Sequence, residues 1–315
     1  MKARVERARR VLAFELADFF FGLLPRRFSY VLMTTVGWIV ATLFKGRVAG
    51  LVDNLRTVFP DYDETQITDL MQRNAKNYGK FWVDLFKMPH LDIEYRRSLA
   101  VIDGKEYLDR VLAEGNGCLV VSIHMGGWEG CAALWGATQD YESALIAEVL
   151  EPPALWRRVL ELRQSSGVTM IPLGRAAPRE MLRRLKRNGL VAGAFDRDIL
   201  GTGKPYQFFG KTARIPNGML AVAQHVGCGV IPVICLREPD DTYRLVGFEP
   251  VYVGPGDRGI DEATEHLLRV FEGCIRKYPD QWHVMEPIWS EPGVAAAAAP
   301  AMAPIDTRAE EANVG

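Results

Sequence analysis

One histidine of this sequence has a carboxylate at a spacing that suits acid–base chemistry. The stretch VSIHMGGWEG, residues 121–130, contains His124 and, five positions later, Glu129. A carboxylate that accepts the imidazole N–H fixes the tautomer and stabilises the imidazolium, which leaves the other ring nitrogen as a general base. Such a pair can activate a hydroxyl group directly, without a serine or cysteine nucleophile. The spacing also fits a hydrogen-bonded core histidine or a helix cap, so the position in the fold has to decide between them.

The residues around this histidine indicate the end of a strand and then a turn. The run CLVVSI at 118–123 is apolar and β-branched, as in a buried strand. Gly126 and Gly127 permit a tight turn into a helix that begins near Trp128 and carries the glutamate. Glycines also let a substrate approach the backbone, whose N–H groups can stabilise an oxyanion. We therefore expect a catalytic His/Glu pair, with Gly126, Gly127 and Trp128 as substrate-binding residues.

A second charged cluster, FDRD at 195–198, follows the apolar run LVAGA at 190–194. Neighbouring parallel strands place their carboxyl ends at one crevice, so this cluster is expected near the histidine. We assign Asp196 and Asp198 to the catalytic group and Arg197 to substrate binding. A solvated loop is the alternative for all three.

The next segment, GTGKPYQFFGKTARIP at 201–216, is expected to be a long substrate-binding loop because it combines glycines, lysines and aromatic residues. Lys204 and Phe209 are its candidate contacts. The GKT at 210–212 would need a glycine at position 205 to form a phosphate-binding loop, and the chain has Pro205. The sequence also lacks G-x-S-x-G and H-E-x-x-H, which argues against the commonest hydrolases and metalloproteases.

The pattern of apolar residues divides the chain into regions. The first hundred residues show helical spacing, whereas short strand-like runs alternate with helical stretches from about residue 100. Repeated strand–helix units predict an α/β fold with a mostly parallel central sheet flanked by helices. We place a helical, membrane-associated region at 1–95, the α/β domain at 96–291, and a disordered Ala/Pro-rich tail at 292–315.

Residues 28–44 form a run of seventeen uncharged residues with arginines and lysines on both sides. A bilayer-spanning helix needs about 20 apolar residues, so the run fits a short span, an interfacial helix or a buried core helix. Three phenylalanines at 19–21 and the basic start of the chain favour contact with a membrane surface that bears anionic headgroups.

Composition narrows the partners further. The net charge is −1, which does not suggest a nucleic-acid partner. The five cysteines are widely spaced without a C-x-x-C pair, so neither a disulfide framework nor a metal site is expected. The basic segment RAAPREMLRRLKR at 175–187 is either a solvated helix face or a docking surface for an acidic carrier or anionic headgroups.

Several short motifs in a fixed order resemble a known family. The chain is similar to the bacterial lipid A lauroyl/myristoyl acyltransferases and the related phosphatidylinositol mannoside acyltransferases of actinobacteria, within the lysophospholipid acyltransferase-like superfamily. The similarity extends to about Trp289. It rests on the His-x4-Glu pair, DRD at 196–198, FFG at 208–210, NLRTVFP at 54–60 and YPDQW at 278–282.

The resemblance implies a transferase on the cytoplasmic side of the plasma (inner) membrane. It would move a fatty acyl chain from acyl-CoA or acyl carrier protein to a hydroxyl of a membrane glycolipid, a lipid A precursor or a phosphatidylinositol mannoside, with no further cofactor. In that family the histidine is the base and the acid assists it, which here are His124 and Glu129. The D-x-D element corresponds to Asp196 and Asp198.

A Glu/Arg pair of the mannoside branch is matched by Glu148 and Arg163, which the resemblance implies bind substrate. Two other functions remain open on the sequence alone: a non-catalytic lipid-binding protein that uses the same apolar groove, and a lipid esterase or thioesterase in which water replaces the acceptor hydroxyl.

Overall fold

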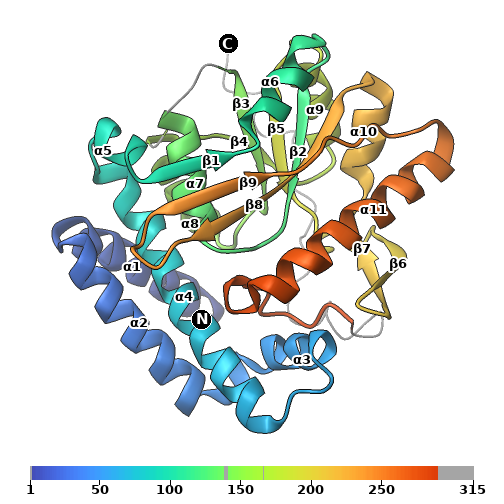
Figure 1. Cartoon of the computed structure of the whole chain (residues 1–315). Helices are drawn as coiled ribbons and strands as arrows, with labels where there is room; N and C mark the ends of the chain where they lie inside the picture. Colours follow the sequence, from blue (N-terminus) through green and yellow to red (C-terminus); the bar gives the residue numbers. More distant parts are fainter. Residues whose placement is uncertain (1, 138–140, 166, 290–315) are drawn as a thin grey trace.

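The computed structural model describes residues 2–137, 141–165 and 167–289 (Figure 1). A seven-stranded sheet has the strand order β1-β9-β8-β2-β5-β3-β4, and all neighbouring strands are parallel except β8 and β9. The α/β class and the mostly parallel sheet are thus confirmed. The strands are β1 (Ala100–Asp103), β2 (Cys118–Ser122), β3 (Ser143–Ala147), β4 (Thr169–Pro172), β5 (Leu190–Ala194), β8 (Gly229–Arg237) and β9 (Tyr243–Gly247).

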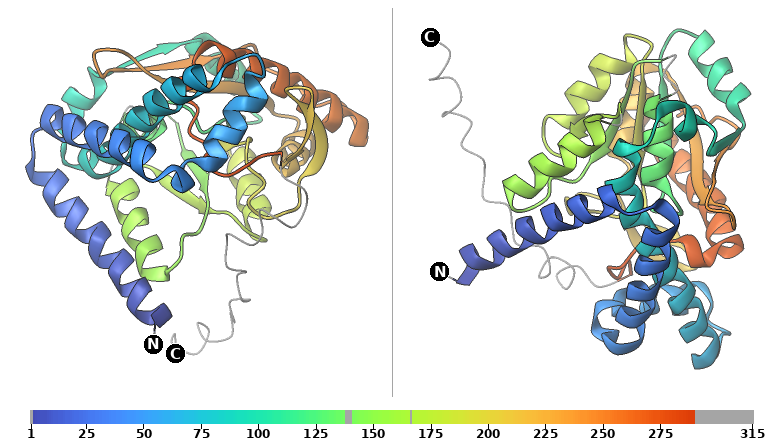
Figure 2. Two further views of the ribbon diagram at one scale, coloured as in Figure 1. Left: turned by 90° about the horizontal axis from the view of Figure 1, so that it is seen from below. Right: turned by 90° about the vertical axis from the view of Figure 1, so that its left-hand side faces the viewer.

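Helices cover both faces of this sheet (Figures 1 and 2). The central strands β2 and β8 are almost wholly buried, which explains their continuous apolar sequences. The helices of the α/β part are α6 (Lys105–Ala113), α7 (Trp128–Ala137), α8 (Pro153–Ser165), α9 (Ala177–Leu185), α10 (Gly218–Val226) and α11 (Gly256–Lys277), followed by the short 3₁₀ helix η3 (Pro279–Gln281).

The first hundred residues are mostly helical, as expected. They form α1 (Lys2–Leu23), α2 (Arg26–Leu43), α3 (Ala49–Val58), α4 (Glu64–Lys87) and α5 (Ile93–Arg97), with the 3₁₀ helices η1 (Lys45–Arg47) and η2 (Met88–His90). The helix α4 begins at a capping box between Asp63 and Gln66. Glycine at position 37 of α2 lets the two helices pack closely, because a Cβ there would lie 2.3 Å from the Ala75 carbonyl oxygen on α4.

A buried ionic cluster joins these helices to the sheet. The Asp84 carboxylate on α4 accepts hydrogen bonds from the hydroxyls of Tyr30 (2.5 Å) and Tyr243 (2.7 Å) and pairs with the guanidinium of Arg237 on β8. Asp84 is 1 % exposed, so its charge is stabilised by these partners rather than by water. The cluster therefore fixes α2 and α4 against β8 and β9.

One expectation about a segment needs correction, and one alternative can be assessed. The 201–216 segment is not a loop throughout, because it forms the antiparallel hairpin of β6 (Lys204–Phe208) and β7 (Lys211–Ile215). Among the described helices, none combines the length and apolar character needed to cross a membrane, which leaves the spanning alternative for 28–44 without support. The tail at 292–315 lies outside the described residues.

Candidate active site

His124 lies just beyond the carboxyl end of β2, and an aspartate that follows the neighbouring strand β5 holds it in place. Its ring Nδ1 is 2.7 Å from Oδ1 of Asp196, and its backbone N–H donates to Oδ2 of the same carboxylate at 2.9 Å. The aspartate directly follows Phe195 at the end of β5, the parallel neighbour of β2. The crevice expected between neighbouring strand ends has therefore brought these two residues together.

Asp196 is almost completely buried and remains ionised. A third hydrogen bond to it comes from the indole Nε1 of Trp282, at 3.0 Å. Burial alone would raise the pKa of this carboxyl group, but the charge of His124 and the three hydrogen bonds outweigh it and hold the pKa below the usual value. An ionised carboxylate only accepts hydrogen bonds, so Nδ1 of His124 carries a proton and Nε2 is left to act as the base.

Glu129 does not partner the imidazole, contrary to the sequence-based prediction. Its carboxylate receives Nε of Arg163 at 3.1 and 3.2 Å and pairs with the terminal nitrogen of the same guanidinium. Glu129 lies in the first turn of α7 and faces α8, which carries Arg163; their side chains are 4 % and 12 % exposed. The same guanidinium lies 5.0 Å from the ring centre of Trp128. Glu129 therefore stabilises the wall beside His124.

The two glycines after His124, Gly126 and Gly127, lie where close packing leaves no room for a side chain. Gly126 has φ of +63°, and a Cβ there would lie 2.0 Å from the Cys235 carbonyl oxygen. Its N–H donates to the Gln281 carbonyl oxygen at 2.6 Å, so it is already used and does not point at an oxyanion. A Cβ at Gly127 would lie 2.6 Å from the Tyr243 ring. Both positions therefore require glycine for packing, neither glycine is among the residues that line the cavity, and their substrate contacts stay a prediction.

Phe209 is also a structural residue. It occupies the turn of the β6–β7 hairpin with φ of +52°. Its backbone N–H donates to Glu272 at 2.5 Å, and its ring packs against Trp289 and Arg276. These contacts attach the hairpin turn to α11, and Phe209 is not among the residues that line the cavity beside His124.

Asp198 lines the cavity, but its oxygens are used to shape the chain after β5. They accept the backbone N–H groups of Thr202 (3.1 Å) and Gly203 (2.9 Å), and Arg214 lies 3.4 Å away. Asp198 thus holds the loop that leads into the hairpin. Lys204, at the start of β6, also lines the cavity and lies 3.9 Å from Asp261.

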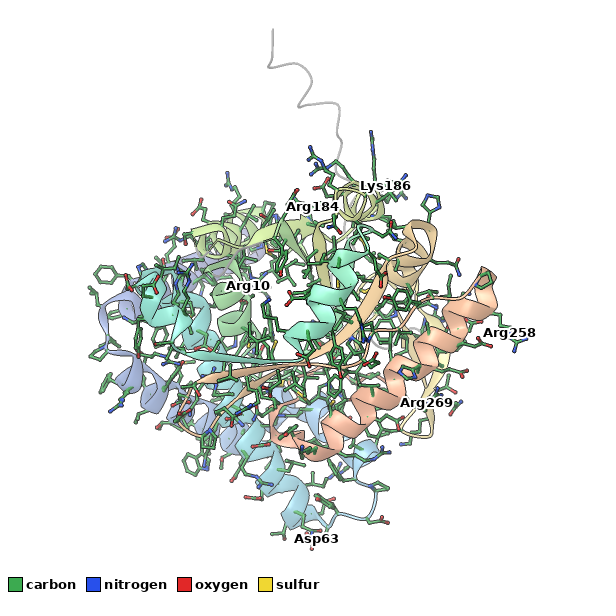
Figure 3. The ribbon with its side chains drawn as sticks, turned by 45° about the horizontal axis from the view of Figure 1, so that its top comes forward. Arg10, Asp63, Arg184, Lys186, Arg258 and Arg269 are labelled. Atoms are coloured by element: carbon green, nitrogen blue, oxygen red, sulfur yellow. The ribbon has the colours of Figure 1, made fainter. Side chains whose placement is uncertain are left out.

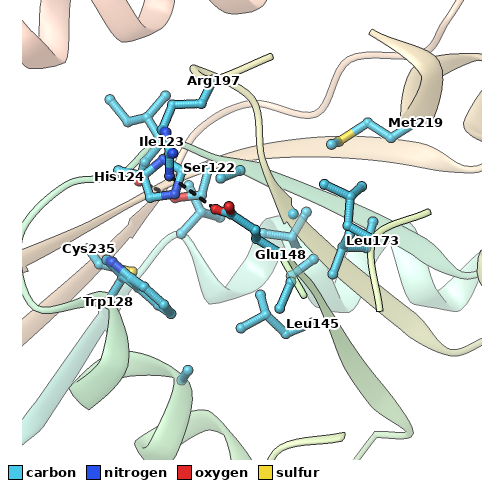
Figure 4. A pocket seen from close by; sticks show the side chains of 18 of the residues that line it. Ser122, Ile123, His124, Trp128, Leu145, Glu148, Leu173, Arg197, Met219 and Cys235 are labelled. Carbon is cyan, nitrogen blue, oxygen red and sulfur yellow. Dashed lines mark hydrogen bonds and ion pairs between the residues drawn. The ribbon is translucent and has the colours of Figure 1, made fainter. Parts of the chain in front are cut away.

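A cavity of about 730 Å³ opens beside His124 (Figure 4). Its lining residues come from the sheet and from the helices α4, α6, α7, α8, α9 and α10, and its volume suits a small-molecule ligand. His124, Glu148 and Arg197 are among its polar lining residues, and Arg197 lies 3.5 Å from Glu148 and 2.9 Å from Glu286. The apolar wall includes Val120, Trp128, Leu145, Ile231, Val233 and Leu245.

Sequence reasoning missed a second histidine at this site. The backbone N–H of His283 donates to the His124 carbonyl oxygen at 2.8 Å, and its ring lines the cavity. Nδ1 lies 3.1 Å from Oδ1 of Asn74, whereas the buried Nε2 has no hydrogen-bond partner among the described residues. Burial, together with the nearby charges of Arg237 and His124, lowers the pKa of His283 to about 3. His283 is therefore neutral near pH 7 and offers Nε2 as an acceptor.

Comparison with known proteins identifies the family of this chain. The sequence model described as bacterial lipid A biosynthesis acyltransferase matches residues 11–291. The chain belongs to this family. It is 32% identical over 230 residues to a phosphatidylinositol mannoside acyltransferase of Mycobacterium tuberculosis strain H37Rv, with 70% of each chain covered. A protein of the same name from Mycolicibacterium smegmatis is 31% identical over 225 residues, which cover 70% of this chain and 72% of the relative.

The family membership confirms the resemblance drawn from the ordered motifs, and it identifies the chain as an acyltransferase. Within this acyltransferase, the structure assembles His124, Glu129, Trp128, Glu148, Arg163, Arg197, Asp198 and Lys204 around one cavity, with Asp196 behind the histidine.

His283 should make this acyltransferase less stable at mildly acidic pH. Its folded-state pKa of about 3 lies below the 6.5 of an ordinary histidine, so between these values the unfolded chain binds more protons and stability falls as the pH falls. From pH 7 to pH 5 this group contributes a loss of about 2 kcal/mol in unfolding free energy. Urea unfolding at both pH values should show that His283→Gln removes most of this loss.

The matched control is His225→Gln, because His225 is exposed near the end of α10. This variant should keep the wild-type pH dependence. Equal pH dependence in wild type and His283→Gln would contradict a buried, neutral His283.

Proposed function

We propose that this acyltransferase moves a fatty acyl chain from a thioester donor to a hydroxyl of a phosphatidylinositol mannoside-type glycolipid at the cytoplasmic surface of the inner (plasma) membrane. The observation that carries the proposal is the pairing of His124 with a buried aspartate at the polar end of a long apolar cavity. The names of the mycobacterial relatives support the class of acceptor.

The geometry at His124 suits direct transfer. Nε2 removes the proton of the acceptor hydroxyl as its oxygen attacks the thioester carbonyl carbon. The C–O bond forms, the C–S bond breaks, and the departing thiolate takes the proton back from the imidazolium. Asp196 stabilises the imidazolium through Nδ1–H and keeps the ring oriented. Neither a covalent acyl-enzyme nor a separate nucleophile is required.

The two parts of the cavity suit the two substrates. The apolar wall takes the acyl chain, where each buried methylene contributes about 0.8 kcal/mol to binding of the donor, acyl-CoA or acyl carrier protein. The carboxylate of Glu148 and the guanidinium of Arg197 lie on the polar side, where they can accept from and donate to sugar hydroxyls. A glycolipid acceptor therefore fits the end of the cavity at which the base stands.

Acyl transfer should depend on both members of the His124–Asp196 pair. With a palmitoyl thioester and a mannosylated phosphatidylinositol as substrates, His124→Ala should lose nearly all activity. Asp196→Asn should lower kcat by roughly 10²- to 10⁴-fold, because the amide cannot compensate the imidazolium charge. The measurement is acylated glycolipid formed per unit time, with circular dichroism to confirm that each variant is folded.

His225→Ala, which changes an exposed histidine on α10, is the matched control and should keep the wild-type rate. Wild-type activity in His124→Ala or Asp196→Asn would overturn the mechanism. Free fatty acid as the only wild-type product would indicate a hydrolase, and tight lipid binding without any product would indicate a lipid-binding protein.

We further propose that α1 and α2 rest on the membrane surface. The helix α1 projects from the body of the molecule and contacts α4 and α8 near its carboxyl end (Figure 2). The two helices expose many large apolar side chains, and exposed arginines lie at the start of α1. The apolar residues include Leu12, Leu16, Phe19, Phe20, Leu23, Phe28, Val31 and Leu43, and the arginines are Arg7, Arg9 and Arg10.

Replacing two exposed phenylalanines of α1 should weaken membrane binding. Phe19 and Phe20 are 62 % and 55 % exposed, and each inserted phenylalanine contributes about 1.5–3 kcal/mol. Phe19→Ser/Phe20→Ser should therefore lower co-sedimentation with anionic lipid vesicles at least tenfold. Tyr252→Ser, which changes an exposed aromatic residue beyond β9, should bind as the wild type does. Equal vesicle binding of all three proteins would contradict attachment through α1.

A further inference from the structure

The helix α1 has two opposite faces that are mostly apolar. Because successive residues of an α-helix are about 100° apart, Phe14, Ala17, Asp18 and Phe21 share one side of it, here called the inner face. The apolar residues of this face join one cluster with residues of α4 and α8. The outer face lies on the opposite side and is exposed; it consists of Val5, Leu12, Leu16, Phe19 and Leu23. Whatever fixes the inner face therefore also decides where the outer face points.

The inner face contains one buried charge. Asp18 is 6 % exposed, and its Oδ2 pairs with the guanidinium of Arg158 on α8. Its Oδ1 has no hydrogen-bond partner among the described residues, and Nε2 of His90 lies 3.7 Å from it. Burying a carboxylate is unfavourable without a compensating charge. The helix α1 therefore keeps its place only while Asp18 faces Arg158.

Two neighbouring contacts hold α1 less specifically. The ring of Phe21 stacks on Phe86 of α4, with ring centres 5.8 Å apart. Nζ of Lys87 donates to the Gly22 carbonyl oxygen at 2.8 Å, at the carboxyl end of α1. Apolar contact has no preferred direction, whereas a carboxylate–guanidinium pair has a defined geometry. The ion pair is therefore the contact that fixes the rotation of α1 about its own axis.

The helix that receives Asp18 also forms part of the cavity wall. Arg163 of α8 lines the cavity and pairs with Glu129 in the first turn of α7, which lines it too. Arg158 lies in the same helix α8, which runs beside α1 (Figure 2). Side-chain contacts thus lead from α1 through α8 to the wall of the cavity. They connect the direction of the outer face to the orientation of the site.

We propose that Asp18 and Arg158 form a positioning pair, which fixes α1 on the body of the enzyme and so sets how the cavity is presented to the lipid surface. This inference rests on the proposed acyl transfer and on the proposed contact of α1 with the membrane. A glycolipid anchored in a bilayer reaches His124 only if the cavity faces it at the right height and angle. Without the pair the outer face still binds lipid, but the body tilts and the acceptor hydroxyl meets Nε2 less often. An acceptor that is free in solution has no such requirement.

The test offers one head group in two forms, with one palmitoyl thioester as the donor. The first form is a mannosylated phosphatidylinositol in lipid vesicles, and the second is its deacylated, water-soluble counterpart. With the vesicle acceptor, Asp18→Asn and Arg158→Gln should each lower kcat about tenfold, because the body is no longer aligned. With the soluble acceptor both variants should keep the wild-type rate, which also shows that they are folded. Asp18→Arg/Arg158→Asp restores an ion pair and should recover the vesicle rate to within about threefold of the wild type.

Glu6→Gln is the matched control, because it removes the same charge from α1 without touching the body of the enzyme. Glu6 lies 3.6 Å from Arg10, which is labelled in Figure 3, and both side chains are exposed. This variant should equal the wild type with both acceptors. All the variants should co-sediment with vesicles as the wild type does, because the outer face is unchanged.

Three results would overturn the positioning pair. The first is a wild-type vesicle rate in both Asp18→Asn and Arg158→Gln. The second is an equal loss with both acceptors, because the pair would then support the cavity itself. The third is a loss of vesicle binding in these variants, because the pair would then act on lipid binding. Failure of the wild type to bind vesicles would instead refute the membrane contact, and failure to acylate either acceptor would refute the proposed function.

Discussion

The buried carboxylate of Asp196 is the interaction on which the site depends. It accepts three hydrogen bonds, from the backbone and ring of His124 and from the indole of Trp282. These bonds join the ends of β2 and β5 to the chain segment after α11. Burying a charge is unfavourable unless it is paired and hydrogen-bonded, so the carboxylate requires all three contacts to be in place. The three hydrogen bonds that position His124 therefore also join the ends of the two strands to the segment after α11.

The segment after α11 extends this dependence to the amino-terminal helices. Asn74 on α4 donates to the Trp282 carbonyl oxygen at 2.6 Å and holds the His283 ring, while Asn54 on α3 donates to the carbonyl oxygens of Val284 (3.0 Å) and Glu286 (2.8 Å). Both asparagines are almost fully buried. At these carbonyl oxygens the irregular segment has no strand or helix partner among the described residues, and the asparagine side chains supply the hydrogen bonds instead. The amino-terminal helices α3 and α4 therefore also hold the segment that carries Trp282 and His283 at the site.

The sequence predicted the fold and the place of the site because both follow from local patterns. Apolar runs marked β2, β3, β4 and β5, and the rule that parallel strand ends share a crevice brought Asp196 to His124. The spacing to Glu129 was misleading, since it could not show that the first turn of α7 faces Arg163 on α8. His283 was missed because its neighbours in sequence carry no spacing signal, and its contact with His124 spans more than 150 residues of chain.

The central claim is that Asp196, and not Glu129, fixes the tautomer of His124. It can be measured by nitrogen-15 NMR of histidine-labelled protein in wild type, Asp196→Asn and Glu129→Gln near pH 7. The structure predicts a protonated Nδ1 with a downfield proton in the wild type, the same signal in folded Glu129→Gln, and its loss or large upfield shift in Asp196→Asn. A signal that disappears in Glu129→Gln and persists in Asp196→Asn would contradict the account.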